Sequence, residues 1–579
     1  MRRVSRSSLA LAGLLLLPGV AGAQGRTDYD AAEGLYAAGE LLEGGHPLAA
    51  QLFAKGWPTD EAHKKLTQEL SAAPADALLQ GYLASGFGPS VAQSDYFLSR
   101  RELRTKSGDS FESNDDLLGD DLRVFRHLSG YGRSTASFRP PLFPFAQGKR
   151  ELRGSASEDD LRSLAWRDGQ GKHTLEALGM ALVLETRYAW DELLVRRTET
   201  QSGKEVTLWG RDPRSGFLAL VALEAAAAKV WELRTQLIYD ARSGAIGPKR
   251  GLRNLDVHRY VFPQSWTSTR EGDILKHTLA DSDGGKEKSR LRAQAAVLLG
   301  ASLLARLSLD SGDRELNGLF GQQSVRNQKV FLFHPDLRQA VVEVATFCFE
   351  SLRTIHVRVA GDARASTLAD PDRGPGATIT PSDLGLFLVA IEEFLKIPSP
   401  RSLNDKDLIS KLSDEQSKAR ALCLSLGRFM AEWVSPRDPG AYDKYDAQEG
   451  SRAGQGRSLL SQGMLIRGLV AGHRVTHPGK NTSPLLQAAR DMVRLVDERF
   501  WNQEAGAYCE ISGAKRAELF GAAALLGGLR ELALETGDGR YLLRYRQFLQ
   551  RLHGSGWYEP ASGNTPAGLL PETSFTQNK

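Results

Sequence analysis

Two kinds of helix alternate along this chain from about residue 155 onward, and this alternation limits the possible folds more than any other feature. The first kind is apolar nearly all round and rich in alanine and glycine, as in residues 291–309 and 518–534. Such a helix is buried on most sides, whereas an amphipathic helix such as residues 483–499 covers a core on one side only. The alternation predicts an all-α double ring, with buried helices lining an inner barrel and amphipathic helices forming an outer jacket.

A short motif marks the ends of the outer helices. Gly-Ala follows four of them, at Gly244, Gly376, Gly440 and Gly506, with spacings of 132, 64 and 66 residues. Glycine supplies the positive φ that a chain needs after a helix. The chain has 58 glycines, so chance pairs are the alternative, but the common phase of the pairs relative to the helices favours a true repeat of about 65 residues. We count five helix pairs, whose buried helices begin near residues 173, 288, 382, 456 and 515.

The remaining segments fit this repeat in different ways. A sixth pair is available from residues 28–86, which have apolar residues at helical spacing. The double-length unit contains two polar stretches, 246–287 and 311–336, which we interpret as long loops. A reverse turn recurs within two pairs as Ser311-Gly-Asp and Thr536-Gly-Asp, where Asp can cap the next helix.

Over roughly residues 155–579 the chain resembles the six-hairpin (α/α) toroid superfamily. Two segments carry the resemblance best, Phe500-Trp-Asn-Gln-Glu-Ala-Gly-Ala-Tyr508 and Thr380-Pro-Ser-Asp-Leu-Gly-Leu-Phe-Leu388. The superfamily includes glycoside hydrolases, glycan phosphorylases, polysaccharide lyases and sugar epimerases, and no catalytic signature of a single family is matched. The resemblance implies a toroid of five to six helical hairpins, with a poly- or oligosaccharide bound at the N-terminal ends of the inner helices.

The first 23 residues are typical of a signal peptide. Arg2, Arg3 and Arg6 form a basic start, residues 9–17 form an apolar run, and Ala21-Gly-Ala is a pattern that signal peptidase accepts. The run is shorter than the ~20 residues of a membrane-spanning helix. We expect cleavage before Gln24 and export through the Sec route to the periplasm or the medium.

Four segments follow from these observations. They are a signal peptide (1–23), an N-terminal helical region (24–103), a polar and proline-rich linker (104–154) and the toroid domain (155–579). Hydrophobic residues make up 41% and charged residues 25% of the chain, a mix that excludes a disordered chain and a polytopic membrane protein. Loss of three arginines with the signal peptide takes the net charge of +4 to near +1, which gives no case for a nucleic-acid partner. No apolar stretch beyond the signal peptide is long enough to span a membrane.

The cysteine content excludes a disulfide scaffold. There are three cysteines, of which Cys348 and Cys423 lie on apolar helical faces and are interpreted as buried thiols; one bridge remains open as an alternative. Because the chain has no C-x-x-C and no H-E-x-x-H, we expect no metal and no cofactor.

Four acidic residues in the loops after outer helices, or at the start of an inner helix, are the candidate catalytic residues: Asp443, Asp446, Asp383 and Asp256. Cleavage of a glycosidic bond needs two carboxyl groups on opposite sides of the bond, about 5–9.5 Å apart. Aromatic rings on the same loops provide flat surfaces for sugar C–H groups. The candidate substrate-binding residues are Tyr442, Tyr445, Glu449, Trp266, Tyr260 and Trp557.

The segment 438–455 is the most specific of these predictions. Median connections have ~4–6 residues, and longer loops tend to be functional. We expect Asp443 or Asp446 to face the barrel mouth, with Asp383 or Asp256 as the second carboxylate. For Asp383 a capping role at a helix start is the competing interpretation. The predicted function is an exported carbohydrate-active enzyme that hydrolyses a glycosidic bond with two carboxylates. The alternative is a non-catalytic toroid that binds envelope glycan or a protein.

Overall fold

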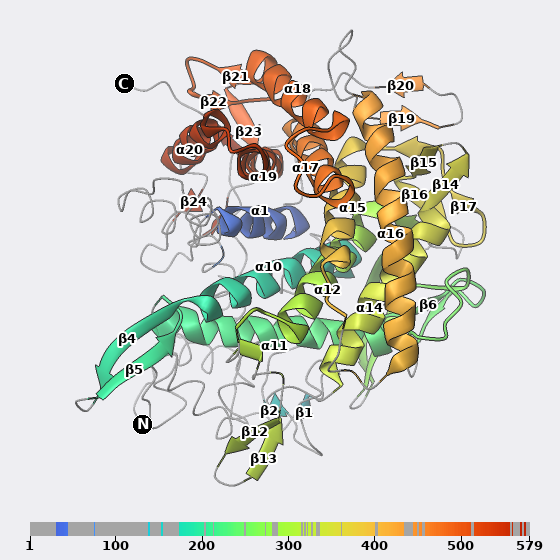
Figure 1. Cartoon of the computed structure of the whole chain (residues 1–579). Helices are drawn as coiled ribbons and strands as arrows, with labels where there is room; N and C mark the ends of the chain where they lie inside the picture. The colour runs from blue at the N-terminus through green and yellow to red at the C-terminus, as the bar shows by residue number, and fades with distance from the viewer. Residues whose placement is uncertain are drawn as a thin grey trace, which may run out of the picture.

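A computed structural model describes residues 31–44 and most of residues 173–574, together with residue 75 and the short pieces 137–138 and 152–153. The longest gaps inside the main range are residues 281–287, 434–443 and 560–567. Helices carry the architecture of this described part: it has eleven α-helices and one π-helix, and its strands are short (Figure 1). The predicted all-α fold class is confirmed.

Six helices form a closed inner ring. Each helix packs against the next in chain order, and the last packs against the first, so the ring has no open side (Figure 1). Most residues of these helices are buried, because each helix has a ring neighbour on either side. The ring consists of α1 (Ala31–Glu43), α10 (Leu175–Leu194), α12 (Leu291–Leu309), α15 (Pro381–Leu395), α17 (Leu459–Thr476) and α19 (Leu519–Thr536).

Five helices form the outer layer, and each packs on the inner helix that precedes it in the chain. The double-ring toroid is therefore confirmed, and the five inner helices whose starts were predicted begin within four residues of those positions. The π-helix η1 (Leu352–His356) extends one outer helix. The outer helices are α11 (Pro213–Thr235), α14 (Leu337–Ser351), α16 (Lys406–Trp433), α18 (Pro484–Arg499) and α20 (Gly539–Gly554).

The sixth inner helix comes from the N-terminal region. Helix α1 lies between α10 and α19 and contacts both, so it closes the ring. The sequence allowed for a sixth pair in residues 28–86, but it placed the toroid domain at 155–579. The ring instead includes residues 31–43. The proposed signal peptide and nearly all of the proposed linker lie outside the described residues.

Glycines let the inner helices approach closely, as their composition predicted. A Cβ atom at Gly463 of α17 would lie 2.3 Å from the backbone nitrogen of Leu525 in α19. Likewise, a Cβ atom at Gly385 of α15 would lie 2.3 Å from the carbonyl oxygen of Met464 in α17. Both distances are far below van der Waals contact, so a larger side chain at either position would push two ring helices apart.

The repeated junction after the outer helices is a small β-hairpin with a glycine at positive φ. Gly244 has φ 69° and Gly506 has φ 60°, and the amide of each donates to the carbonyl four residues earlier, on Asp240 and Asn502. In the second copy the residue with this role is Gly374, with φ 83°, so the alignment on Gly376 was wrong by two residues. The copy at Gly440 lies outside the described residues.

The reverse turns within helix pairs are as predicted. Gly312 and Gly537 both have positive φ, at 78° and 68°. Asp538 accepts a hydrogen bond from the amide of Arg540 and caps α20, and Asp313 accepts one from the amide of Leu316.

Short strands decorate the ring, mostly at the N-terminal ends of the inner helices. β3 (His173–Thr174), β11 (Ser289–Arg290) and β23 (Arg516–Glu518) each lead directly into an inner helix. The two stretches interpreted as loops contain hairpins, β9 (Ser265–Glu271) with β10 (Ile274–Leu279) and β12 (Gln322–Val325) with β13 (Gln328–Phe331). The other strands are β1 (Ser137–Phe138), β2 (Leu152–Arg153), β4 (Arg196–Gln201), β5 (Lys204–Trp209), β6 (Tyr239–Asp240), β7 (Ala245–Ile246), β8 (Tyr260–Val261), β14 (Val357–Ala360), β15 (Asp362–Ala365), β16 (Leu368–Asp370), β17 (Gly374–Pro375), β18 (Thr378–Ile379), β19 (Lys444–Asp446), β20 (Ser451–Ala453), β21 (Trp501–Asn502), β22 (Ala507–Tyr508), β24 (Tyr558–Glu559), β25 (Gly568–Leu569) and β26 (Glu572–Ser574).

Two sequence predictions concern the whole described part. Its helices include none with the length and apolar character that a membrane crossing requires. Cys348, Cys423 and Cys509 are all buried free thiols. Burial raises the pKa of the Cys509 thiol to about 11, and the pKa values of the other two rise further for the same reason.

Candidate functional site

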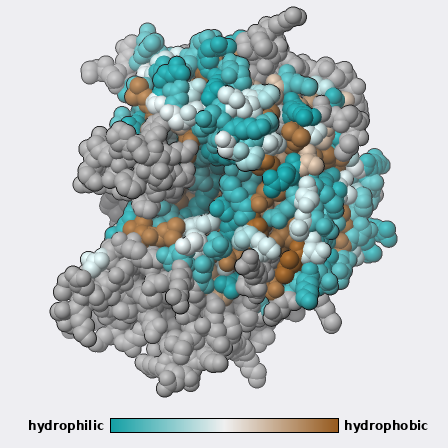
Figure 2. All heavy atoms as spheres, in the orientation of Figure 1, coloured by the Kyte–Doolittle hydropathy of each residue, from teal (hydrophilic) through white to brown (hydrophobic). Residues whose placement is uncertain are grey.

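The inner ring encloses a cavity of about 710 Å³ at the C-terminal ends of its helices. All six inner helices contribute to its wall, so the cavity lies on the axis of the ring. Figure 2 shows a hydrophilic hollow near the centre of the face drawn. The wall consists of Leu42, Glu43, Arg187, Trp190, Asp191, Leu194, Leu303, Arg306, Val389, Glu392, Glu393, Lys396, Arg467, Arg474, Arg530, Glu531, Leu534 and Glu535.

The cations of this axial cavity lie where the direction of the inner helices favours positive charge. The chain returns through an outer helix after each inner one, so the inner helices run the same way and their C-terminal ends meet at the cavity. A helix C-terminus carries about half a negative elementary charge, which favours cations nearby. Six cations line the cavity: Arg187, Arg306, Lys396, Arg467, Arg474 and Arg530.

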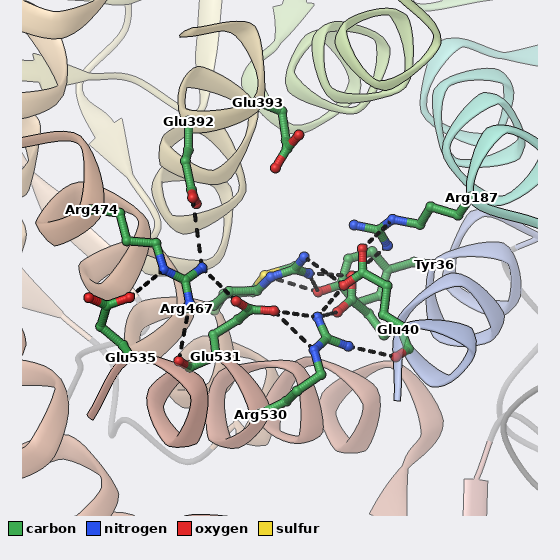
Figure 3. A network of polar contacts seen from close by, with 12 residues as sticks. Tyr36, Glu40, Arg187, Glu392, Glu393, Arg467, Arg474, Arg530, Glu531 and Glu535 are labelled. Carbon is green, nitrogen blue, oxygen red and sulfur yellow. Dashed lines mark hydrogen bonds and ion pairs between the residues drawn. The ribbon is translucent and has the colours of Figure 1, made fainter. Parts of the chain in front are cut away.

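The charged side chains around the cavity form a network of ion pairs. Glu40 of α1 lies at the centre of its deeper part (Figure 3). Its carboxylate accepts hydrogen bonds from Arg187 at 2.9 Å, from Arg530 at 3.4 Å and from Arg467. Arg530 also donates to the backbone carbonyl of Glu40 at 2.9 Å, and Arg467 donates to the hydroxyl of Tyr36 at 3.0 Å. The Glu40 side chain is 0% exposed. A single buried carboxylate thus fastens α1 to α10, α17 and α19.

Arg474 of α17 is the centre of the more exposed part of the network. It donates to Glu531 at 2.6 Å and to Glu535 at 2.7 Å, both on α19. Its guanidinium also lies 3.7 Å from the carboxylate of Glu392 on α15 (Figure 3). Arg474 therefore bridges the two ring neighbours of its own helix.

The opposite wall combines charge with an aromatic ring. Lys396, at the end of α15, lies 2.7 Å from a carboxylate oxygen of Glu393, which also pairs with Arg306 of α12. The guanidinium of Arg306 lies over the indole of Trp190 on α10, 5.0 Å from the ring centroid. Leu194, one turn further along α10, is 37% exposed. This wall thus places an aromatic ring, one face of which Arg306 covers, beside fixed charges.

Several carboxylates of the network are held ionised. Burial favours the neutral form of Glu40, but its three arginines outweigh burial and hold its pKa at about 2. Burial is likewise outweighed at Glu393, where Lys396 and Arg306 hold the pKa at about 2. At Glu531 burial again favours the neutral form, but the nearby arginines, Arg474 most strongly, hold the pKa well below its usual range. These three groups do not carry a proton near neutral pH.

This arrangement of charges can bind a ligand, but Glu40, Glu393 and Glu531 are poorly suited to proton transfer. A general acid must keep its proton until the reaction, which requires a pKa near the working pH. Ionised carboxylates and guanidinium groups in fixed positions instead accept and donate charge-assisted hydrogen bonds. Within the described part of the chain, no group of three or more His, Cys, Asp or Glu side chains has the geometry of a metal site.

The predicted catalytic acids lie elsewhere. Asp383 is in the first turn of α15, at the opposite end of the ring, is 7% exposed, and accepts a hydrogen bond from Ser382 at 3.5 Å. Asp256 is exposed, accepts a hydrogen bond from the amide of His258 in its own turn, and is absent from the cavity wall. Asp446 is half-buried in β19, opposite Thr378 of β18. Asp443 lies outside the described residues.

The predicted aromatic residues have packing roles where the structure describes them. Trp266 is 1% exposed in the core, and its strand pairs with β3. The ring of Tyr260 lies under the guanidinium of Arg259 at 4.8 Å. Tyr445 is buried, with its ring edge-on to Phe429 at 5.2 Å. Tyr442, Glu449 and Trp557 lie outside the described residues, so the predicted site at that end of the ring stays a prediction.

Sequence reasoning missed the cavity because it searched the loops. The signal lies in the inner helices themselves: charged residues recur in the C-terminal halves of helices that are otherwise apolar. Pairs such as Glu392-Glu393 and Arg530-Glu531 interrupt long runs of Leu, Ala and Gly. A buried charge is costly unless it is paired, so such interruptions indicate a shared network.

Comparison with known proteins gives likeness of fold only. No protein-family model and no curated protein matches this chain. Among solved structures, a sugar epimerase from a ruminal bacterium aligns at TM-score 0.40 and 10% identity, over 69% of this chain and 84% of the other. Cellobiose 2-epimerase from Bacillus thermoamylovorans aligns at TM-score 0.34 and 10% identity, over 75% and 78%. The resemblance to (α/α) toroids is thus confirmed at the level of fold, by the closed ring of helix contacts rather than by these alignments.

Proposed function

We propose that this chain is an exported carbohydrate-active protein that holds a small saccharide in the axial cavity. The cavity itself is the observation that carries the proposal. Its volume of about 710 Å³ falls within the range of about 300–1,000 Å³ that is usual for ligand pockets. The ion pairs fix donors and acceptors in place before a ligand arrives, which lowers the entropic cost of binding hydroxyl groups. Trp190 adds a ring on which sugar C–H groups can stack.

The cavity favours binding over hydrolysis at this end of the ring. Two-carboxylate hydrolysis needs one carboxyl group that stays protonated until it acts. The pKa values of Glu40, Glu393 and Glu531 are held low by their cations. These three carboxylates therefore serve binding rather than acid catalysis, and a non-catalytic binding role is the form of the proposal that they support.

Hydrolysis at the N-terminal end of the ring is the second candidate. The observation in its favour is Asp383, a carboxylate that is more than nine-tenths buried at the start of an inner helix. In this candidate Asp383 is one of the two carboxyl groups, and the second comes from the loops that surround it.

Two variants separate these candidates. The mature chain is titrated by calorimetry with neutral mono- and disaccharides, and the same mixtures are analysed for products. Trp190→Ala is expected to weaken binding at least about tenfold, a loss of 1.4 kcal/mol, while Asp383→Asn leaves binding unchanged. Turnover that disappears in Asp383→Asn would instead favour hydrolysis at the other end. Absence of binding to every saccharide contradicts the proposal.

Export has its own test. Mass spectrometry of the protein from an expressing cell should show a mature chain that begins at Gln24. An intact Met1 on the mature protein contradicts this part of the proposal.

A further inference from the structure

Three cations, Lys396, Arg306 and Arg474, are the most exposed charged side chains in the described wall of the axial cavity, and we call them the cation group. The side chain of Lys396 is 41% exposed, that of Arg306 27% and that of Arg474 25%. The four glutamates that they hold, on α15 and α19, are between 7% and 19% exposed. A ligand in the cavity therefore finds these cations more accessible than the carboxylates that hold them.

The members of the cation group come from three adjacent helices of the inner ring, and shared carboxylates hold them close together. Glu393 pairs with both Lys396 and Arg306. The carboxylate of Glu392 lies 2.7 Å from Lys396 and 3.7 Å from Arg474. The cations of α12, α15 and α17 thus form one continuous group in the cavity wall.

The cation group keeps hydrogen-bond donors that its carboxylates do not use. A guanidinium has five N–H donors and no acceptor. Among the described residues, Arg306 donates hydrogen bonds through Nη1 alone, to Glu393, and Arg474 donates one from each of its three nitrogens. Both oxygens of Glu393 already accept, one from Arg306 and the other from Lys396. The group can therefore donate further hydrogen bonds to a ligand without losing its carboxylates.

The helix ends do not reverse this preference for acceptors. Arg306 and Arg474 lie in the last turns of α12 and α17, and Lys396 directly follows α15. Each cation thus offsets the partial negative charge at the C-terminus of its own helix. The wall as a whole has six cations and six carboxylates, so its choice of ligand depends on which charges are exposed and not on net charge.

We infer that the axial cavity takes an acidic saccharide, whose carboxylate, sulfate or phosphate ester accepts hydrogen bonds from Lys396, Arg306 and Arg474. This inference rests on the proposed function, because it names the class of saccharide that the cavity binds. The ionised form of such a group accepts hydrogen bonds, and those from guanidinium and ammonium are charge-assisted. Trp190, beside Arg306, gives the sugar ring an aromatic contact. A protonated amino sugar meets the same cations with a like charge and is disfavoured.

Matched sugars test the inference. Calorimetry measures binding of the neutral sugar, its uronate, uronamide, 6-sulfate and 6-phosphate, and the corresponding amino sugar, in the gluco, galacto and manno series. At least one acidic derivative should bind about tenfold more tightly than the neutral sugar, and this gain should shrink as salt rises toward about 1 M, where screening acts over about 3 Å. If the uronate is that derivative, the uronamide, which has no charge, should lose the gain. Equal affinities for neutral and acidic sugars, or tightest binding of the amino sugar, overturn the inference and leave the proposed function standing.

Substitution of the most exposed cation tests the role of the group. Lys396→Gln removes one positive charge while Glu393 keeps Arg306, so the preference for the acidic sugar should fall severalfold. Lys396→Arg, which restores the charge, should restore most of the preference. Lys515→Gln is the matched control, because Lys515 pairs with Glu504 at the other end of the ring. A preference that Lys396→Gln leaves unchanged, in a variant that melts as the wild type does, contradicts the inference.

Simple anions separate the two ways of failing. Acetate, sulfate and inorganic phosphate are titrated beside the sugars. If these ions bind and no saccharide does, the cation group binds anions but the saccharide function fails, and the inference fails with it. If neither ions nor sugars bind, the anion selection fails as well.

Discussion

At the scale of single residues, Glu40 is the side chain on which the most buried charge depends. Its removal leaves three arginines in the ring interior without their shared carboxylate. Breaking a buried ion pair from one side costs about 3–5 kcal/mol, because the remaining charge stays desolvated. We expect Glu40→Gln to lower the free energy of unfolding by that amount in urea titrations. Glu504→Gln, at an exposed pair with Lys515, should cost less than about 1 kcal/mol, and equal losses in the two variants would contradict this role.

Glu232 gives a prediction about pH at the same scale. Burial raises its pKa to about 7, with Lys229 acting in the opposite direction, and His277 lies 3.8 Å away. A folded pKa above the unfolded value of about 4.3 means that the folded chain favours the protonated form. The stabilisation from this group is present below pH 4 and is lost as the pH rises through 7.

The comparison of wild type with Glu232→Gln isolates this effect, since glutamine resembles the neutral acid. The variant should gain stability relative to wild type between pH 5 and pH 8, by a few kcal/mol at about 1.4 kcal/mol per pKa unit. Melting temperatures of both proteins across this range check the sign. If the melting temperatures of the two proteins instead change with pH in parallel, Glu232 has the same pKa in the folded and unfolded chains, and the prediction is wrong.

At the scale of elements, close packing between ring helices depends on glycine. A Cβ at Gly463 would lie 2.3 Å from a backbone nitrogen of α19, an atom that cannot move without the whole helix. Gly463→Ala should therefore destabilise the protein by about 1–3 kcal/mol, although alanine favours a helix by ~1 kcal/mol. Gly539→Ala in the first turn of α20 is the control, because its Cβ would meet no atom within 4 Å. Chemical unfolding midpoints should fall in the first variant and stay or rise in the second.

At the scale of the whole molecule, ring closure by α1 is the feature to test. Deletion of residues 1–43 removes one of six ring members and the carboxylates that pair with Arg187, Arg467 and Arg530. We expect the melting temperature to fall by more than about 10 °C; domains of about 150–250 residues lose about 2–4 °C per kcal/mol, and the loss of a whole ring member costs several kcal/mol. Deletion of residues 1–30, which stops before α1, should leave it unchanged. An intact melting transition after the longer deletion would show that five hairpins suffice.

The candidate site was less accessible from the sequence than the fold. Asp383 was placed correctly at the start of an inner helix, because a first-turn acid has a local signature. The axial cavity has no local signature of comparable strength. Its central contacts join residues far apart in the chain, such as Glu40 with Arg530, 490 positions away. Gly527 is a similar case. A glycine in an inner helix indicates close packing, but only the fold shows what packs against it: a Cβ atom at Gly527 would lie 2.6 Å from a carboxylate oxygen of Glu40.

The sequence by itself determined the all-α double ring, the order of inner and outer helices and the starts of five inner helices. It did so because the spacing of apolar and polar residues along each helix, at the period of one helical turn, shows which of its faces are buried. The tertiary structure alone decided that α1 closes the ring and that the charged residues of all six inner helices meet at one end. Both depend on which helices become neighbours: a charged residue in an apolar helix indicates that a partner exists, but its sequence does not say on which helix that partner lies.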